Sequence, residues 1–267
     1  MIPAALVRRD KTLLNSVQQA SIAFIDRAMP DLRRLSQKGA GAVFRELATG
    51  TLDQFGNAAR IASTASYGDM RASVVPKATP LDAKRPFSVT PEVVDPAVGY
   101  AMGHFVRGDM LGASTALASS VGLLVADTYR STASYLSERD PYAVSMQRIA
   151  GPRACAFCAY AATMSTRYQQ EVNGAEIFQS MEKFHAHCGC SLIPLFKNVS
   201  VFQASYMADM QDHVDLAMRD IRDMYRYAKS LPEAQGLKRK EFFAAYPDTA
   251  LTTENIAKRL RLVNGYR

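Results

Sequence analysis

The sequence predicts a mostly helical α+β protein. It has N-terminal helices, a proline-rich linker, a small α+β module and a helical C-terminal tail. Apolar residues recur at helical spacing towards both ends of the chain, prolines crowd one internal stretch, and a third segment gathers all four cysteines. The 267 residues are 48% hydrophobic and 21% charged, the proportions of an ordinary globular protein. This composition excludes a wholly disordered chain.

Residues 1–73 form the predicted helical N-terminal region. Leu13, Val17, Ala20 and Phe24 follow one another at helical intervals, which predicts a helix over 11–29 that Pro30 ends. A second helical stretch is expected from Leu32 to about Met70, interrupted by two glycines. Its glycines and apolar positions are Gly39, Gly41, Val43, Phe44, Leu47, Leu52, Phe55 and Ile61.

Residues 74–96 form the predicted linker and supply the expected domain boundary. Proline removes a backbone donor and biases the preceding residue towards extended geometry. The prolines of this stretch are Pro76, Pro80, Pro86, Pro91 and Pro96.

Residues 97–198 form the predicted α+β module. Helices are expected over 97–107 and 110–138, and short strands over 142–150 and 191–196, the second at a sheet edge because it contains Pro194. The uncharged run 110–126 is at the lower limit of length for a membrane span and rich in small polar residues. We therefore expect a buried helix, a soluble protein and no membrane partner.

Residues 199–267 form the predicted C-terminal tail. Tyr206, Met210, His213, Ala217 and Ile221 recur every three or four positions, which predicts a helix over 201–229. Thr253 and Glu254 are expected to begin a last short helix, because Thr can cap it and Glu complements its positive end.

The four cysteines lie in two groups, together with two of the four histidines. The first group is Cys155-Ala156-Phe157-Cys158, and 26 residues later comes His185-Ala186-His187-Cys188-Gly189-Cys190. Two cysteines three apart can direct both sulfurs at one zinc ion, and tetrahedral zinc needs two further ligands from another segment. We predict a structural Zn²⁺ that ties the α+β module. Its candidate ligands are Cys155, Cys158, His185, Cys188 and Cys190, with His187 as an alternative.

Other interpretations of the cysteines stay open at this point. They are two disulfides, a redox-active Cys-x-x-Cys pair, or buried thiols without a metal. A catalytic zinc would need an open coordination position and a nearby base, whereas here the candidate ligands suffice to close the shell. No Ser/His/Asp order, phosphate loop or paired carboxylates were found. We therefore expect no enzyme, with a zinc hydrolase or a cysteine nucleophile as the enzymatic alternatives.

The net charge of +7 is spread over the two flanks of the chain. Residues 1–75 carry a net +4, residues 76–196 are neutral and residues 197–267 carry +3, with one dense run at Lys238-Arg239-Lys240. Such diffuse basic charge is typical of a solvated face, and it also favours non-specific attraction to nucleic acid.

The stretch from Leu124 to Phe196 resembles the phage Mu F-type head-morphogenesis family, the minor capsid proteins of tailed phages, in particular those of actinobacterial phages. The matching pieces are Asp127-Thr128-Tyr129-Arg130, Arg139-Asp140-Pro141, the run Gly151–Ala159 with the first cysteine pair, and the run His185–Phe196. The family's His-x-x-Cys-x-Cys pattern corresponds to His185, Cys188 and Cys190. The resemblance covers about a quarter of the chain.

This resemblance implies a minor structural protein that acts in head morphogenesis, DNA packaging or ejection. Its implied partners are the phage portal or the major capsid protein, with packaged double-stranded DNA as a further partner through the diffuse basic charge. Its implied location is the virion, in the capsid interior or at the portal vertex, and the host cytoplasm during assembly. The alternative function is a zinc-dependent nucleic-acid-binding protein.

Overall fold

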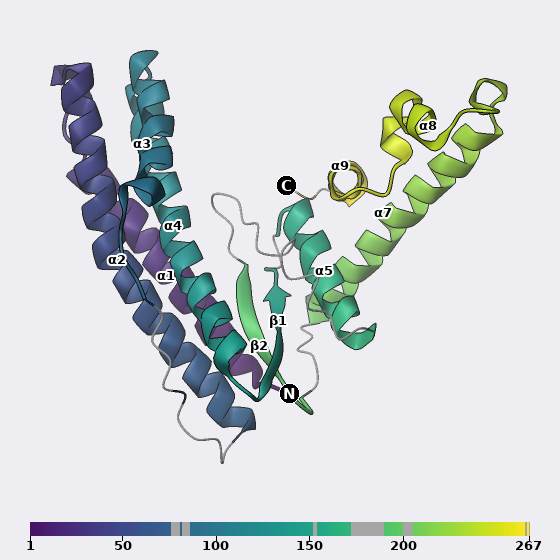
Figure 1. Cartoon of the computed structure of the whole chain (residues 1–267), viewed down its shortest axis with the longest axis horizontal. Helices are drawn as coiled ribbons and strands as arrows, with labels where there is room; N and C mark the ends of the chain where they lie inside the picture. Colours follow the sequence, from purple (N-terminus) through teal and green to yellow (C-terminus); the bar gives the residue numbers. More distant parts are fainter. Residues whose placement is uncertain are drawn as a thin grey trace. The chain divides into compact units, whose positions relative to one another are not determined.

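The computed structural model describes residues 1–75, 81, 86–151, 154–171, 190–199, 205–264 and 266. The chain divides into two compact units, Met1–Met146 with Phe178–Ser200, and Gln147–Ile177 with Val201–Arg267 (Figure 1). The predicted mostly helical α+β class is confirmed, with a small two-stranded antiparallel sheet beside the helices. The first unit includes helices α3 (Pro91–Val106) and α4 (Met110–Arg139), whereas the sequence analysis placed most of these residues in a separate module, 97–198.

Helix α1 (Ala4–Ala28) opens the first unit and begins earlier than predicted. Its buried face is one position away from the predicted stripe: Leu14 and Ile25 are fully buried, whereas Ala20 is exposed. The apolar pattern of the sequence did not indicate this face, because polar residues also lie on it. The buried positions are Val7, Asp10, Leu14, Gln18, Ser21 and Ile25.

Helix α2 (Gln37–Val74) follows the short 3₁₀ helix η1 (Leu32–Arg34) and is continuous for 38 residues. The predicted interruption at Gly39 and Gly41 is wrong. Both glycines lie in the opening turns, where the Ser36 side chain accepts a hydrogen bond from the Gly39 backbone N–H at 3.1 Å. An N-cap of this kind satisfies a donor that the helix itself leaves without a partner.

The last part of the predicted linker belongs to helix α3 (Pro91–Val106). Pro91 occupies the first turn, where the missing N–H costs no hydrogen bond, and Pro96 removes only one bond further along. Phe87, which precedes the helix, packs against the hydrophobic core of the unit. Residues 76–80 and 82–85 of the predicted linker lie outside the described residues.

Helix α4 (Met110–Arg139) is the helix against which α1, α2 and α3 all pack. Asp109 caps it by accepting a 2.8 Å hydrogen bond from Gly112 N–H. By length and composition alone this helix could cross a membrane. Its residues Ala113, Leu117 and Val121 are instead fully buried in the helical bundle, as predicted for the run 110–126.

The two predicted strands are confirmed as β1 (Ala143–Ile149) and β2 (Ser191–Phe196). Their register is marked by a 2.9 Å hydrogen bond from Lys197 N–H to the Tyr142 carbonyl oxygen. Strand β2 is buried along its whole length and packs against α4, α2 and α1. The Phe196 ring meets Tyr67 of α2 edge-on, with ring centroids 5.9 Å apart.

The second unit is built from helices α5 (Ala156–Glu171), α7 (Ser205–Ser230) and α9 (Thr253–Asn264), which pack on one another. Val214, Ile221, Ile256 and Leu260 form the centre of its core. A second small core around Phe242 joins the end of α7 to η2 (Pro232–Ala234) and α8 (Arg239–Ala245), and η3 (Pro247–Thr249) follows. Helix α8 was not predicted, because three consecutive basic residues obscure its apolar side.

Candidate functional site

The Cys-x-x-Cys segment forms the start of helix α5. Cys155 precedes the helix, and its carbonyl oxygen accepts the first helical hydrogen bond from Ala159 N–H at 2.9 Å. The Cys155 sulfur accepts a hydrogen bond from Cys158 N–H at 3.3 Å, so sulfur takes the part that an oxygen plays at most helix starts. The two cysteines therefore share one turn, at the positive end of a helix, where negative charge is stabilised.

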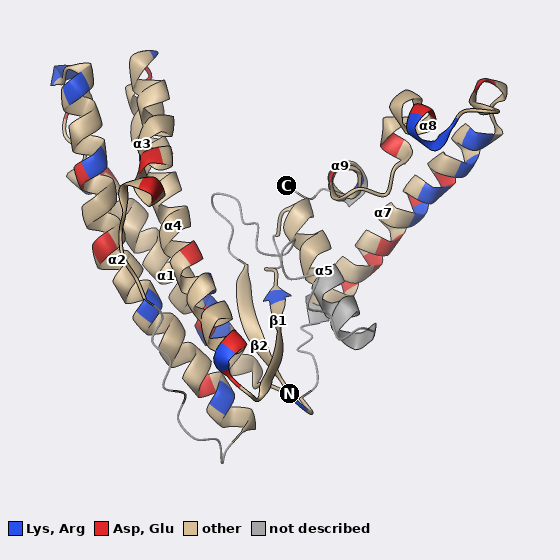
Figure 2. Ribbon diagram, in the orientation of Figure 1, with Lys and Arg blue, Asp and Glu red and all other residues tan. Residues whose placement is uncertain are grey.

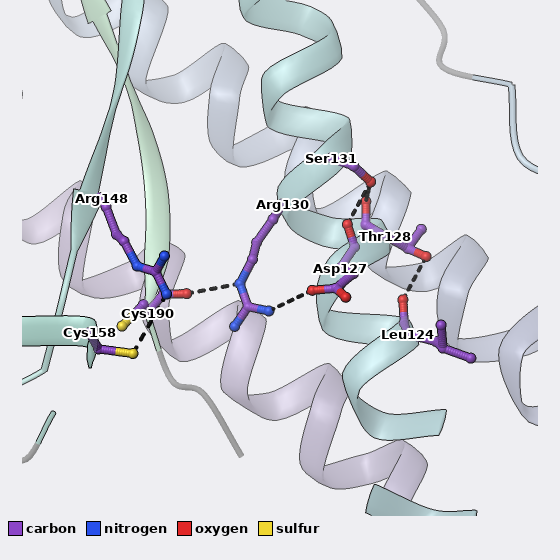
Figure 3. Close-up of polar contacts among 8 residues, drawn as sticks. All are labelled: Leu124, Asp127, Thr128, Arg130, Ser131, Arg148, Cys158 and Cys190. Atoms are coloured by element: carbon purple, nitrogen blue, oxygen red, sulfur yellow. Dashed lines mark hydrogen bonds and ion pairs between the residues drawn. The ribbon is translucent and has the colours of Figure 1, made fainter. Parts of the chain in front are cut away.

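A buried arginine faces the second of these cysteines. Arg148 of β1 is fully buried, and one of its terminal nitrogens donates to Cys158 Sγ at 3.6 Å (Figure 3). Its guanidinium also lies 5.4 Å from the centre of the Phe157 ring. Arg148 thus places a buried positive charge beside one of the candidate metal ligands.

A second buried arginine holds the backbone of Cys190. Arg130 of α4 donates from Nε to the Cys190 carbonyl oxygen at 3.0 Å and from a terminal nitrogen to Asp127 at 3.0 Å (Figure 3). Arg130 is 2% exposed, so its charge-assisted bond to the Cys190 carbonyl is buried, whereas the Asp127 side chain at its other end is 44% exposed. The segment Asp127-Thr128-Tyr129-Arg130, which the resemblance singled out, thus fixes the residue that leads into β2.

Tyr129 of the same segment points to a buried carboxylate that the sequence analysis missed. Asp10 Oδ1 accepts hydrogen bonds from Tyr129 Oη and Ser66 Oγ, both at 2.7 Å, and these join α1, α2 and α4. Burial raises the pKa of Asp10 and the hydrogen bonds lower it. The effect of burial is the larger one, so the pKa rises from 3.8 to about 6. The sequence signal that could have identified Asp10 is its helical spacing from Val7 and Leu14, which places all three residues on the buried face of α1.

Asp140, also in the motif set of the resemblance, forms a buried ion pair. Its Oδ2 accepts from Arg71 Nε at 2.7 Å and from Tyr67 Oη at 3.0 Å, and its Oδ1 accepts from Tyr142 N–H. Burial and the charge of Asp140 raise the pKa of the Tyr67 hydroxyl. The contact ties the C-terminal end of α4 and the start of β1 to the last turns of α2.

The structure describes only part of the predicted metal-ligand set. Cys158 and Cys190 are buried and Cys155 is partly buried, while His185, His187 and Cys188 lie outside the described residues. Among the residues that are described, no three of Cys, His, Asp or Glu form a group that could hold a metal ion. The zinc site therefore stays a prediction.

The geometry defines a mostly helical α+β protein whose motif residues Asp127, Arg130 and Asp140 have structural contacts. A sequence model of the family described as VG15 protein matches residues 1–215. The match covers about four fifths of the chain, so this protein belongs to the VG15 family, a family of phage proteins. No curated protein and no solved structure matches the chain. The match ends inside α7, so the last 52 residues lie beyond it.

Proposed function

We propose that this phage protein is a structural component of the particle. In this proposal it is a minor capsid or portal-associated protein that acts in head morphogenesis, DNA packaging or ejection. The observation that carries the proposal is membership of a phage family over residues 1–215, together with the Mu F-type motifs inside that range. Residues of those motifs make architectural contacts: Arg130 bonds both Asp127 and the Cys190 carbonyl, and Asp140 pairs with Arg71 of α2.

Two buried carboxylates in the core of the first unit also support a structural role for this protein instead of a catalytic one. Asp10 and Asp140 are both buried and bonded to tyrosine, serine or arginine from other helices. Bonds of this kind hold the helices in register and occupy the carboxylates within the core. We therefore propose no catalytic role for this chain.

Exposed apolar side chains near the α3–α4 turn suit contact with a protein partner. Leu111 is 80% exposed, Val106 62% and Tyr100 60%. Contiguous exposed apolar patches are typical of protein–protein contact sites, and we propose that these side chains contribute to one. We propose the portal or the major capsid protein as the partner at this place.

The test is made on purified phage particles. Quantitative mass spectrometry should find the protein there in few copies, and absence from the particles would end the proposal. A phage carrying Val106→Ser and Leu111→Ser should incorporate several-fold less protein. Ile61→Ser is the matched control, since Ile61 is 56% exposed on α2, away from this turn, and should leave incorporation unchanged.

We also propose that a structural zinc ion binds at the Cys155–Cys158 turn, with the remaining ligands drawn from residues 185–190. The support is the arrangement of the two sulfurs in one turn at the start of α5, with the Arg148 guanidinium as a further hydrogen-bond donor to Cys158. Bound zinc would contribute folding free energy to a small module.

Native mass spectrometry of protein purified without chelators should find one zinc per chain. Cys155→Ser with Cys158→Ser should lose it, whereas His104→Ala and His213→Ala should keep it, because these histidines bond Asp109 and Tyr266. Zinc-free wild-type protein would refute the metal proposal and leave the particle proposal standing.

A further inference from the structure

Charge is segregated along helix α7 and into α8. Residues 205–215 contain three aspartates and neither lysine nor arginine, whereas residues 219–240 contain seven basic and three acidic residues. In the ribbon of Figure 2, the basic residues colour the C-terminal part of α7 and the start of α8 blue. We call six exposed members of this group the basic tip: Arg222, Arg226, Lys229, Lys238, Arg239 and Lys240.

Aromatic contacts bring the two parts of the basic tip onto one surface. Lys229 Nζ of α7 lies 4.7 Å from the ring centre of Phe242, and the Arg239 guanidinium lies 6.0 Å from that of Phe243. Tyr225 of α7 in turn packs on both phenylalanines. The charged groups of Lys229 and Arg239 thus lie over aromatic rings, while both residues stay exposed to solvent. Residues ten positions apart in the chain are thus held together.

Helix stability accounts for only some of these cations. A helix dipole stabilises positive charge only in the last turn, which covers Lys229 but not Arg222. Lys238, Arg239 and Lys240 open α8, where the helix end offers a cation no such gain. Within the described parts of the chain, Asp223 is the one carboxylate that forms an ion pair with the tip, through Arg226 at 2.9 Å. The nearby Glu241 carboxylate accepts from Lys238 N–H.

We propose that the basic tip binds the phosphate backbone of double-stranded DNA. The inference rests on the proposed particle function, because a protein at the portal or capsid interior lies beside packaged DNA. Arg222, Arg226 and Lys229 follow one helix face over about 10 Å, and they can meet a row of phosphates. The tip lies beyond residues 1–215, which the family model matches.

Fluorescence anisotropy of the full-length protein with a labelled 30-base-pair duplex tests this inference. The logarithm of the association constant should fall linearly with the logarithm of the salt concentration. The variant K238Q/R239Q/K240Q should bind at least about tenfold more weakly at low salt, with a slope reduced by about 2 to 3. The matched variant R33Q/R34Q/K38Q removes the same charge from exposed positions of the first unit and should change binding less than about threefold.

Equal losses in the two variants would show that binding follows net charge and would overturn the proposal. Tighter binding to anionic vesicles or to a single strand than to the duplex at matched salt would overturn it as well. Circular dichroism checks that both variants fold. Since the assay uses purified protein and DNA, its failure is distinct from failure of the particle proposal, which incorporation into virions measures.

Discussion

At the residue scale, the first unit depends on polar groups buried between helices. Asp10 and Asp140 each accept hydrogen bonds from residues far away in the sequence, Tyr129 and Arg71 among them. These pairings follow from tertiary packing. The sequence shows which residues could pair but not which partners they take. The Cys-x-x-Cys turn could be located because its bond between Cys158 N–H and Cys155 Sγ is local.

Asp10→Asn should remove a pH dependence of stability. Because burial raises the pKa of Asp10 from 3.8 to about 6, the folded state binds the proton more tightly than the unfolded chain. The stability that protonated Asp10 provides is present below about pH 4 and lost as pH rises through 6. The variant should therefore gain stability on wild type over that window, by up to about 3 kcal/mol. Chemical denaturation at pH 4 and pH 8 measures the difference. Exposed Asp53→Asn should show no such trend.

Arg71→Met should destabilise the first unit by about 3–5 kcal/mol, because it leaves the Asp140 carboxylate buried without its cation. Arg9→Met is the matched control. The Arg9–Asp69 pair is as short, at 2.6 Å, but half-exposed, and its loss should cost less than about 1 kcal/mol. Urea denaturation measures the loss of unfolding free energy in both variants. Similar losses would contradict the view that the Arg71–Asp140 pair is the more important one because it is buried.

At the element scale, most helices and both strands could be predicted from apolar spacing and proline positions. The structure differs where polar residues share a buried face, as in α1, or where glycine and proline fall in opening turns, as in α2 and α3. Helix α2 also shows what a glycine contributes to packing. A Cβ at Gly56 would collide with the ring of Phe87, which packs at that point of the helix.

Gly56→Ala should therefore destabilise the protein by about 1–3 kcal/mol, because the Phe87 ring must move. Gly50→Ala and Gly68→Ala lie on the same helix with open space around the new methyl group. Each should stabilise by up to about 1 kcal/mol, since alanine has the higher helix propensity. Thermal unfolding of the three single variants would contradict this view if Gly56→Ala proved as favourable as the others.

At the scale of the whole molecule, two cores have separate memberships. The core of the first unit contains Phe44, Leu117 and Val121, whereas that of the second contains Ile221, Ile256 and Leu260. The diffuse basic charge of the sequence has a local counterpart in the second unit, where the basic tip gathers six cations on a small aromatic core. Sequence spacing could not reveal this, because α8 itself was not predicted.

Differential scanning calorimetry should resolve two unfolding transitions, one for each core. Leu260→Ala removes a fully buried side chain and should destabilise the second unit by about 2–5 kcal/mol, lowering one transition only. Arg71→Met should lower the other. A single transition that responds equally to both substitutions would show that the cores unfold as one.

The path of the chain through the first unit has a consequence for biosynthesis. Strand β2 belongs to that unit, but it is translated after α5, some fifty residues after β1 begins. At bacterial elongation rates of about 5–20 residues per second, the nascent helical bundle waits about 3 to 10 s for its missing strand. During that interval the surface of α4 that β2 will cover is exposed and can be bound by chaperones. The rate of translation therefore limits how early the first unit can complete its fold.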